Sequence, residues 1–232
     1  SKLSEIESGI SRLIFLLAQM PLLGFVWYVS EAQPDLTVWL LASVTLAWLL
    51  IMLWLALHEK GVVKIYLNQL MRILLGLVLL PVCLLAIGFI LRNFENDRLI
   101  ILLMFILIWG ADIAAYFSGK AFGKHKLAPT ISPGKSWEGV FGALLGTVLI
   151  SLLAAWFMGY ATQVLIGFVL FCLYVVAISV VGDLFESLLK RQVGIKDSGN
   201  VLPGHGGVLD RIDSLIAASP AFSLGMYLLG VS

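Results

Sequence analysis

Four carboxylates near the C-terminus stand in two pairs with the same spacing. Asp183 and Glu186 lie three residues apart, and so do Asp210 and Asp213. Residues three or four positions apart share one face of a helix, so each pair would project from one side, with Lys190 on the face of the first pair. Such residues can simply be charges at a membrane edge. Four acids at two adjoining helix ends favour a second interpretation, a site for a divalent metal ion.

A lysine-rich segment, "SGKAFGKHKLAPTISPGKSWE" at 118–138, could bind phosphate. Ser132 and the proline after it are typical of a helix start, with Ser132 as the N-cap. Free backbone N–H groups at a helix start bind anions, and Lys135 would add positive charge there. Lys124 and Lys126 would extend this phosphate-binding loop. Alternatively, the lysines only set the orientation of the protein in the membrane.

Two further residues are candidates by their setting. Asp112 lies within or at the end of the apolar run 99–117, and a carboxylate inside a membrane is a functional candidate by default. A structural hydrogen bond to Tyr116, one turn further on, is the alternative. His205 lies between two glycines and could be a metal ligand, a hydrogen-bond donor to phosphate or a loop residue.

Long apolar segments must position these residues. The chain is 60% hydrophobic and only 12% charged, whereas a soluble domain has about 25% charged residues. Seven apolar runs have about the length that crosses a bilayer as a helix, at 13–29, 36–57, 73–91, 99–117, 140–158, 164–181 and 215–229. The sequence therefore predicts an all-α fold, a polytopic integral membrane helical bundle with about seven transmembrane helices.

The basic residues predict which loops face the cytoplasm. If seven helices alternate in direction, every lysine and arginine except Arg92 and Arg98 falls on one side of the membrane. Cytoplasmic loops are enriched in these residues. The N-terminal side and the loops near 58–72, 118–138 and 182–214 are therefore expected in the cytoplasm, and the C-terminus outside.

The sixth helix is expected to continue beyond its apolar run. Its helical pattern extends to about Gln192, and Gly194 suits a helix end. The last helix is expected to begin near Asp210, so the two acidic faces would lie at the cytoplasmic ends of two helices joined by one loop. Cys83 and Cys172 stand in separate apolar helices and are interpreted as packing residues. The net charge of +1 gives no indication of nucleic acid binding.

The segment "ESLLKRQVGIKDSGNVLPGHGGVLDRIDS" closely resembles the C-terminal signature of the phosphatidate cytidylyltransferases, also called CDP-diacylglycerol synthases. A second block, "WGADIAAYFSGKAFGKHKLAPTISPGKSWEG", is similar to the central cytoplasmic segment of that family. It departs at Ile113 and Ala114, where many members have a small hydroxyl residue and glycine. The resemblance is strong over about 99–230. We therefore expect N-terminal transmembrane helices at 1–98, truncated at their start, and a catalytic transmembrane region with nucleotide-binding loops at 99–232.

The resemblance implies a reaction and its cofactors. CTP and phosphatidic acid would give CDP-diacylglycerol and pyrophosphate, at a two-cation site with Mg²⁺ and a second cation, for which K⁺ is a candidate. It implies that Asp183 and Asp210 hold the metal, and from the chemistry we expect Glu186 and Asp213 to support them. It also implies a cavity open to the cytoplasm and the bilayer, a homodimer, and a bacterial inner membrane as the location.

The chemistry of this reaction needs charge neutralisation more than acid–base catalysis. A phosphate monoester is already ionised near neutral pH, because its second pKa is about 6. We expect Asp183, Asp210, Lys190 and Arg211 to be catalytic. The residues expected to bind substrate are Lys124, Lys126, Ser132, Lys135, Lys196, Asp197, His205, Gly206, Gly207 and Asp112.

Other functions remain open from the sequence. A CTP-dependent membrane lipid kinase of the dolichol or phytol type would use similar nucleotide motifs but release CDP. A transporter could use Asp112 and Asp183, although polar residues concentrated at one face argue against it. A catalytically inactive family member is a third possibility.

Overall fold

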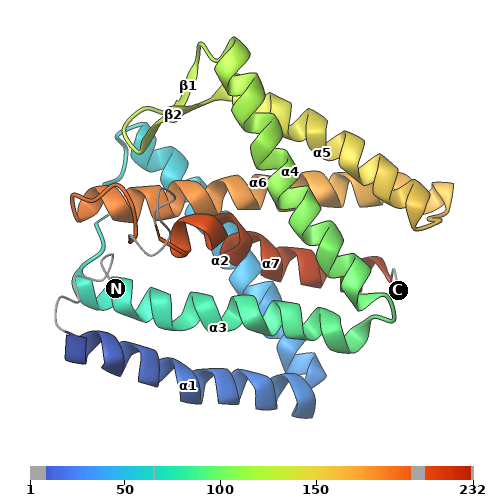
Figure 1. Cartoon of the computed structure of the whole chain (residues 1–232), viewed down its shortest axis with the longest axis horizontal. Helices are drawn as coiled ribbons and strands as arrows, with labels where there is room; N and C mark the ends of the chain where they lie inside the picture. The colour runs from blue at the N-terminus through green and yellow to red at the C-terminus, as the bar shows by residue number, and fades with distance from the viewer. Residues whose placement is uncertain (1–8, 65, 200–206, 231–232) are drawn as a thin grey trace.

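A computed structural model describes residues 9–64, 66–199 and 207–230 of the 232-residue chain. Seven α-helices and one short hairpin make up this part of the chain (Figure 1). They are α1 (Gly9–Ala32), α2 (Pro34–Glu59), α3 (Gln69–Asn93), α4 (Asp97–Phe122), β1 (Lys126–Ala128), β2 (Ser132–Ser136), α5 (Trp137–Phe157), α6 (Thr162–Gln192) and α7 (Leu209–Leu229). All seven helices are long and apolar enough to cross a membrane, which confirms the predicted all-α membrane bundle.

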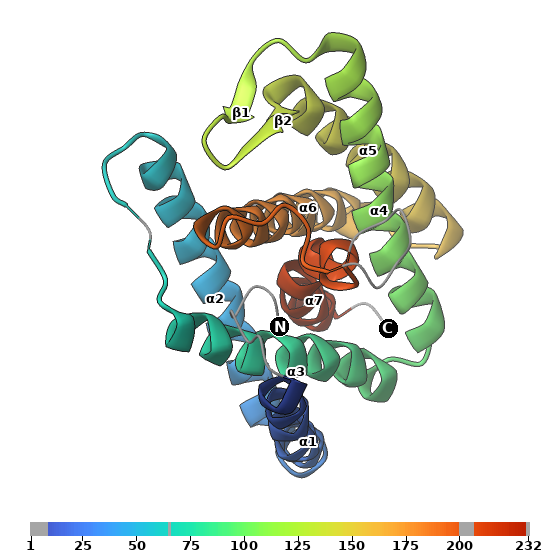
Figure 2. The same ribbon diagram turned by 60° about the vertical axis from the view of Figure 1, so that its left-hand side comes forward.

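The helices pack around α6 and α7. In Figure 1, α3 and α1 lie below this pair, α4 runs from the top down across α6 to the right-hand end of α3, and α2 crosses from the lower right to the upper left. Figure 2 shows α7 surrounded by α2, α3, α4 and α6. In the most apolar 18-residue stretch of α7, 61% of the residues are buried, against 11% in α1. The pair α6–α7 is therefore the centre of the bundle.

The loops that were expected in the cytoplasm lie at one end of the bundle. The start of α1, the α2–α3 connection, the hairpin and the α6–α7 connection are all at the left-hand end of Figure 1. The α1–α2, α3–α4 and α5–α6 connections lie at the other end. This arrangement is the alternation on which the orientation was predicted, and we refer to the first end as the loop end.

Two glycines shape the central pair. Gly194 follows α6 with φ of +69°, in the left-handed region that glycine adopts at little cost, so α6 ends where the sequence predicted. A Cβ on Gly182 would lie 2.6 Å from the Cβ of Ala217 and 2.7 Å from the backbone oxygen of Asp213. The absence of a side chain at Gly182 thus lets α6 and α7 approach closely.

The predicted helix start at Ser132 is wrong. Ser132–Ser136 forms strand β2, which pairs antiparallel with β1, and α5 begins five residues later at Trp137. Ser136 is the N-cap, and its Oγ accepts a hydrogen bond from the Gly139 N–H at 3.2 Å. The hairpin buries Ala128 and Ile131, and this packing outweighs the local preference for a helix.

Candidate active site

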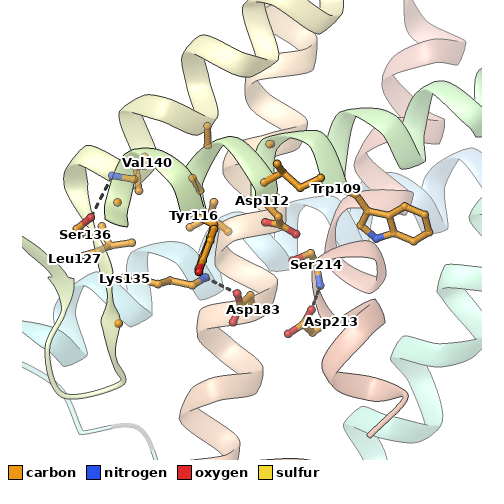
Figure 3. A pocket seen from close by; sticks show the side chains of 18 of the residues that line it. Trp109, Asp112, Tyr116, Leu127, Lys135, Ser136, Val140, Asp183, Asp213 and Ser214 are labelled. Atoms are coloured by element: carbon orange, nitrogen blue, oxygen red, sulfur yellow. Dashed lines mark hydrogen bonds and ion pairs between the residues drawn. The ribbon is translucent and has the colours of Figure 1, made fainter. Parts of the chain in front are cut away.

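A cavity of about 670 Å³ opens between the hairpin, α4 and α5 on one side and α6 and α7 on the other, and we call it the polar cavity after the acidic and basic side chains on its wall. Four carboxylates line it from three helices: Asp112 of α4, Asp183 of α6, and Asp210 and Asp213 of α7. Figure 3 shows Asp112, Asp183 and Asp213 facing a common space, with Lys135 entering from the hairpin. Asp112 and Asp213, which are 101 positions apart in the sequence, therefore meet in one cavity.

The hairpin lysine pairs with the carboxylate of α6. Lys135 Nζ lies 2.6 Å from Asp183 Oδ2, and the two side chains are 25% and 30% exposed. Asp183 Oδ1 accepts a second hydrogen bond from Ser187 Oγ at 3.3 Å. Because both charged groups remain partly accessible, a phosphate can approach Lys135 and a cation can approach Asp183 from the cavity.

Asp112 and Asp213 add negative charge next to this pair. Both interact electrostatically with Asp183 and with Lys135. Asp213 Oδ1 accepts a hydrogen bond from the Ser214 N–H at 2.6 Å. Three carboxylates thus share one lysine in this corner of the cavity. Carboxylate oxygens are the ligands that Mg²⁺ prefers, so the residue types in this corner suit a divalent cation.

A second ion cluster lies deeper, around Lys190. Its Nζ is 2.7 Å from Glu186 Oε2 and 2.8 Å from Asp210 Oδ1. These three side chains are between 7% and 11% exposed, so the cluster is largely desolvated. Removing one member of such a cluster leaves an uncompensated buried charge, which is strongly destabilising.

Asp210 also organises the loop that precedes α7. Its carboxylate accepts hydrogen bonds from the Ser198 N–H at 3.0 Å, from Ser198 Oγ at 2.9 Å and from the Gly207 N–H at 2.7 Å. The same carboxylate accepts a bond from Lys190, so it connects α6, α7 and both ends of their loop. Asp210 therefore holds structure together as well as lining the cavity.

The predicted metal set is divided between these two clusters. Asp183 and Asp213 lie in the corner with Asp112, whereas Glu186 and Asp210 pair with Lys190. No group of three or more His, Cys, Asp or Glu side chains close enough to hold a metal occurs within the described part of the chain. Shared coordination of one ion by Asp183 and Asp210 stays a prediction.

Several predicted substrate-binding residues lie away from the cavity wall. The side chains of Lys124, Lys126, Lys196 and Asp197 are exposed, and Ser132 begins β2; none of the five is among the residues that line the cavity. Gly207 is described through its bond to Asp210, and Arg211 lines the cavity. The predicted residues His205 and Gly206 lie outside the described residues.

The structure adds residues that the sequence did not predict to line the site. Tyr116 and Lys120 line the cavity from α4, one and two turns after Asp112, and Tyr116 points toward Lys135 (Figure 3). The helical spacing from Asp112 was the available signal for both. Ser198 gave no such signal, because its contact with Asp210 depends on how the loop folds.

Contacts outside the cavity fix the hairpin that carries Lys135. The carboxylate of Glu59, the last residue of α2, accepts hydrogen bonds from the Thr130 N–H at 2.8 Å and from Thr130 Oγ1 at 2.5 Å. Arg191 Nε donates to the carbonyl of Ile131 at 3.5 Å. The tip of the hairpin is therefore attached to both α2 and α6.

This fold and site define a class of protein: a helical membrane bundle with paired lysines and carboxylates in a cavity at one end. The model of the cytidylyltransferase family matches residues 2–229, and the chain belongs to this family.

Curated relatives give the same result. The chain is 53% identical over 130 residues to a phosphatidate cytidylyltransferase of Haemophilus influenzae, covering 53% of this chain and 44% of the relative. It is 54% identical over 131 residues to that of Pseudomonas aeruginosa, covering 56% and 48%. It is 38% identical over 169 residues to that of Rickettsia bellii, covering 69% and 72%. The chain spans about half the length of the first two relatives.

Proposed function

We propose that this protein transfers the cytidylyl group of CTP to phosphatidic acid, forming CDP-diacylglycerol and pyrophosphate in phospholipid synthesis. The observation that carries the proposal is the ion pair between Lys135 Nζ and Asp183 Oδ2, at 2.6 Å, which lies on the wall of the polar cavity beside the carboxylates of Asp112 and Asp213. Cationic and anionic groups side by side suit a triphosphate and its accompanying cation. The names of the relatives support the choice of substrates.

The reaction is an in-line displacement at phosphorus. An oxygen of the lipid phosphate forms a bond to the α-phosphorus of CTP, while the bond from that phosphorus to the oxygen bridging the β-phosphate breaks. Pyrophosphate leaves with the electron pair. The attacking oxygen is ionised near neutral pH, because the second pKa of a phosphate monoester is about 6, so no protein base has to remove a proton.

Two anions have to meet, so the residues act by positioning and by neutralising charge. Lys135 leaves Asp183 to bind phosphate oxygens, and Arg211 and Lys120 add positive charge on the cavity wall. Lys190 holds Asp210 and Glu186 in place. The exposed Lys124, Lys126 and Lys196 attract nucleotide toward the loop end of the bundle.

The carboxylates would hold the metal ions. We propose Mg²⁺ and a second cation, with K⁺ as the candidate, at Asp183 and Asp210, supported by Glu186 and Asp213. The geometry adds Asp112, which lies with Asp183 and Asp213 in one corner. Bound cations supply charge stabilisation to the triphosphate and orient the attacking and leaving oxygens.

The location and assembly follow from the same proposal. The loop end would face the cytoplasm of a bacterial inner membrane, where CTP is dissolved and the lipid lies in the adjacent leaflet. We propose a homodimer as the functional assembly, as the family resemblance implies.

The test uses purified protein with phosphatidic acid and CTP carrying label in either the α- or the γ-phosphate. The proposal predicts α-label in a liponucleotide and γ-label in pyrophosphate, both abolished by a chelator. γ-Label in the lipid would instead identify a lipid kinase. Nucleotide-independent solute uptake into proteoliposomes, without either product, would identify a transporter.

A further inference from the structure

A second cavity, of about 420 Å³, lies on the other side of the α6–α7 pair, toward α1, α2 and α3. Its volume is within the range of about 300–1,000 Å³ that is usual for ligand pockets. Most of its wall is aliphatic or aromatic, including Trp48 of α2, Leu75, Leu79 and Leu80 of α3 and Ile216 of α7. The polar reaction described above makes no use of this space.

The apolar cavity is elongated along the bundle and has a cation at its loop end. Its wall extends along α3 from Arg72 to Leu80, a rise of about 12 Å at 1.5 Å per residue. Arg72 is only 7% exposed, and its guanidinium donates to the carbonyl of Leu67 at 2.5 Å. An apolar channel with a buried arginine at the loop end suits a ligand with an anionic head and an apolar tail.

The wall between the two cavities is thin and partly ionic. Asp213 lines both cavities. Glu186 lines the apolar cavity and pairs at 2.7 Å with Lys190, which lines the polar cavity. At Gly182 the two helices touch, but toward the loop end the barrier consists of charged side chains. A tail in the apolar cavity therefore places its head group next to the polar cavity.

One polar atom on this wall, Trp48 Nε1, is buried and has no hydrogen-bond partner within the described part of the chain. Burying an indole N–H without an acceptor is costly. The ester carbonyl of a glycerolipid is an acceptor that can reach such a position inside a membrane protein.

We propose that the apolar cavity binds an acyl chain of phosphatidic acid, with Arg72 attracting the lipid phosphate at its loop end. This inference rests on the proposed function and assigns the lipid half of that reaction to α2, α3 and the inner faces of α6 and α7. It follows that the apolar cavity determines the preference for acyl-chain length, whereas the polar cavity binds the nucleotide.

The first test fills the cavity. Leu80→Trp adds bulk to its wall, and Leu84→Trp, at a position on the same helix that is 54% exposed, is the matched control. We expect Leu80→Trp to lower kcat/KM about tenfold for dioleoyl phosphatidic acid, leaving dihexanoyl phosphatidic acid and the KM for CTP unchanged. An unchanged ratio between the two lipids, or the same change in the control, overturns the inference.

A second test does not depend on the folding of a variant. Phosphatidic acid with a diazirine near the end of one acyl chain is crosslinked to the wild-type protein by light, and labelled peptides are identified. Label on cavity-lining residues of α3 and α7, with competition by dioleoyl phosphatidic acid and not by phosphatidylcholine, supports the inference. Label confined to outward-facing residues, or equal competition by phosphatidylcholine, overturns it. If the wild-type protein makes no liponucleotide from either lipid, the proposed function fails, while specific labelling would still support the lipid site.

Discussion

The two cavities lie on opposite sides of the same pair of helices and are lined by different kinds of side chain. The polar cavity lies between α6–α7 and α4–α5 with the hairpin, and carboxylates and lysines line it. The apolar cavity lies between α6–α7 and α1–α3, and its wall is mostly aliphatic. One helix pair thus presents charged side chains to one neighbour and hydrocarbon to the other, as a reaction between a nucleotide and a lipid requires.

Loss of the carboxylate on α6 should have the largest effect on the polar side. We expect Asp183→Asn to lower CTP-dependent liponucleotide formation by at least about 100-fold, because it removes charge that faces the triphosphate and its cation. Asp97→Asn, at the opposite end of the bundle, is the control and should retain activity. Turnover near the wild-type rate in Asp183→Asn would contradict the role of this corner.

Asp210→Asn should lower both activity and thermal stability. Activity should fall as in Asp183→Asn, and the melting temperature should also fall, because Asp210 accepts hydrogen bonds from Ser198 and Gly207 and pairs with Lys190. Asp183 makes fewer contacts, so Asp183→Asn should keep the wild-type melting temperature. Equal melting temperatures in all three proteins would show that the Asp210 contacts do not stabilise the loop.

The wall between the cavities should be sensitive to Lys190. Lys190→Met leaves Glu186 and Asp210 buried without their cation, which should cost about 3–5 kcal/mol in the free energy of unfolding. Denaturation of the protein in detergent micelles measures this change. A loss below about 1 kcal/mol, the value typical of exposed pairs, would mean that the wall is solvated.

The close approach of α6 and α7 gives a smaller expected effect. Gly182→Ala places a Cβ against Ala217 and the Asp213 backbone, and such overpacking costs about 1–3 kcal/mol. Gly167→Ala is the matched control on the same helix, since its Cβ would meet only Leu229 at an ordinary 3.9 Å. If thermal unfolding shows the same stability for both variants, α6 and α7 pack less closely at Gly182 than the structure indicates.

The attachment of the hairpin should have the smallest effect. Glu59→Gln weakens the two hydrogen bonds to Thr130, each worth about 0.5–1.5 kcal/mol, so the KM for CTP should rise a few-fold while kcat stays the same. Lys60→Gln, at the next and exposed position, should leave both parameters unchanged. A fall in kcat alone would contradict a positioning role for Glu59.

Sequence periodicity and length predicted the bundle itself. The seven helices, the extension of α6 to Gln192 and the start of α7 near Asp210 follow from apolar runs and helix-end signals, which are local properties. The helix start at Ser132 was wrong, because burial of Ile131 and pairing of Ser136 with Lys126 depend on tertiary structure.

The site was only partly predictable for the same reason. Helical spacing predicted that Asp183 shares a face with Glu186 and that Asp210 shares a face with Asp213, and the resemblance pointed to Asp183 and Asp210. Which lysine pairs with which carboxylate could not be predicted, since Lys135 and Asp183 come from segments 48 positions apart. The apolar cavity had no sequence signal, because its residues resemble any others that face lipid.

The most direct measurement compares Lys135→Gln with Leu80→Trp in one kinetic assay, with KM for CTP and the ratio of kcat/KM for dioleoyl and dihexanoyl phosphatidic acid as readouts. If the polar cavity binds CTP and the apolar cavity binds the acyl chain of the lipid, Lys135→Gln should raise only the KM for CTP and Leu80→Trp should lower only the lipid ratio. If each variant shifts both readouts to the same extent, CTP and the acyl chain are not bound in separate cavities.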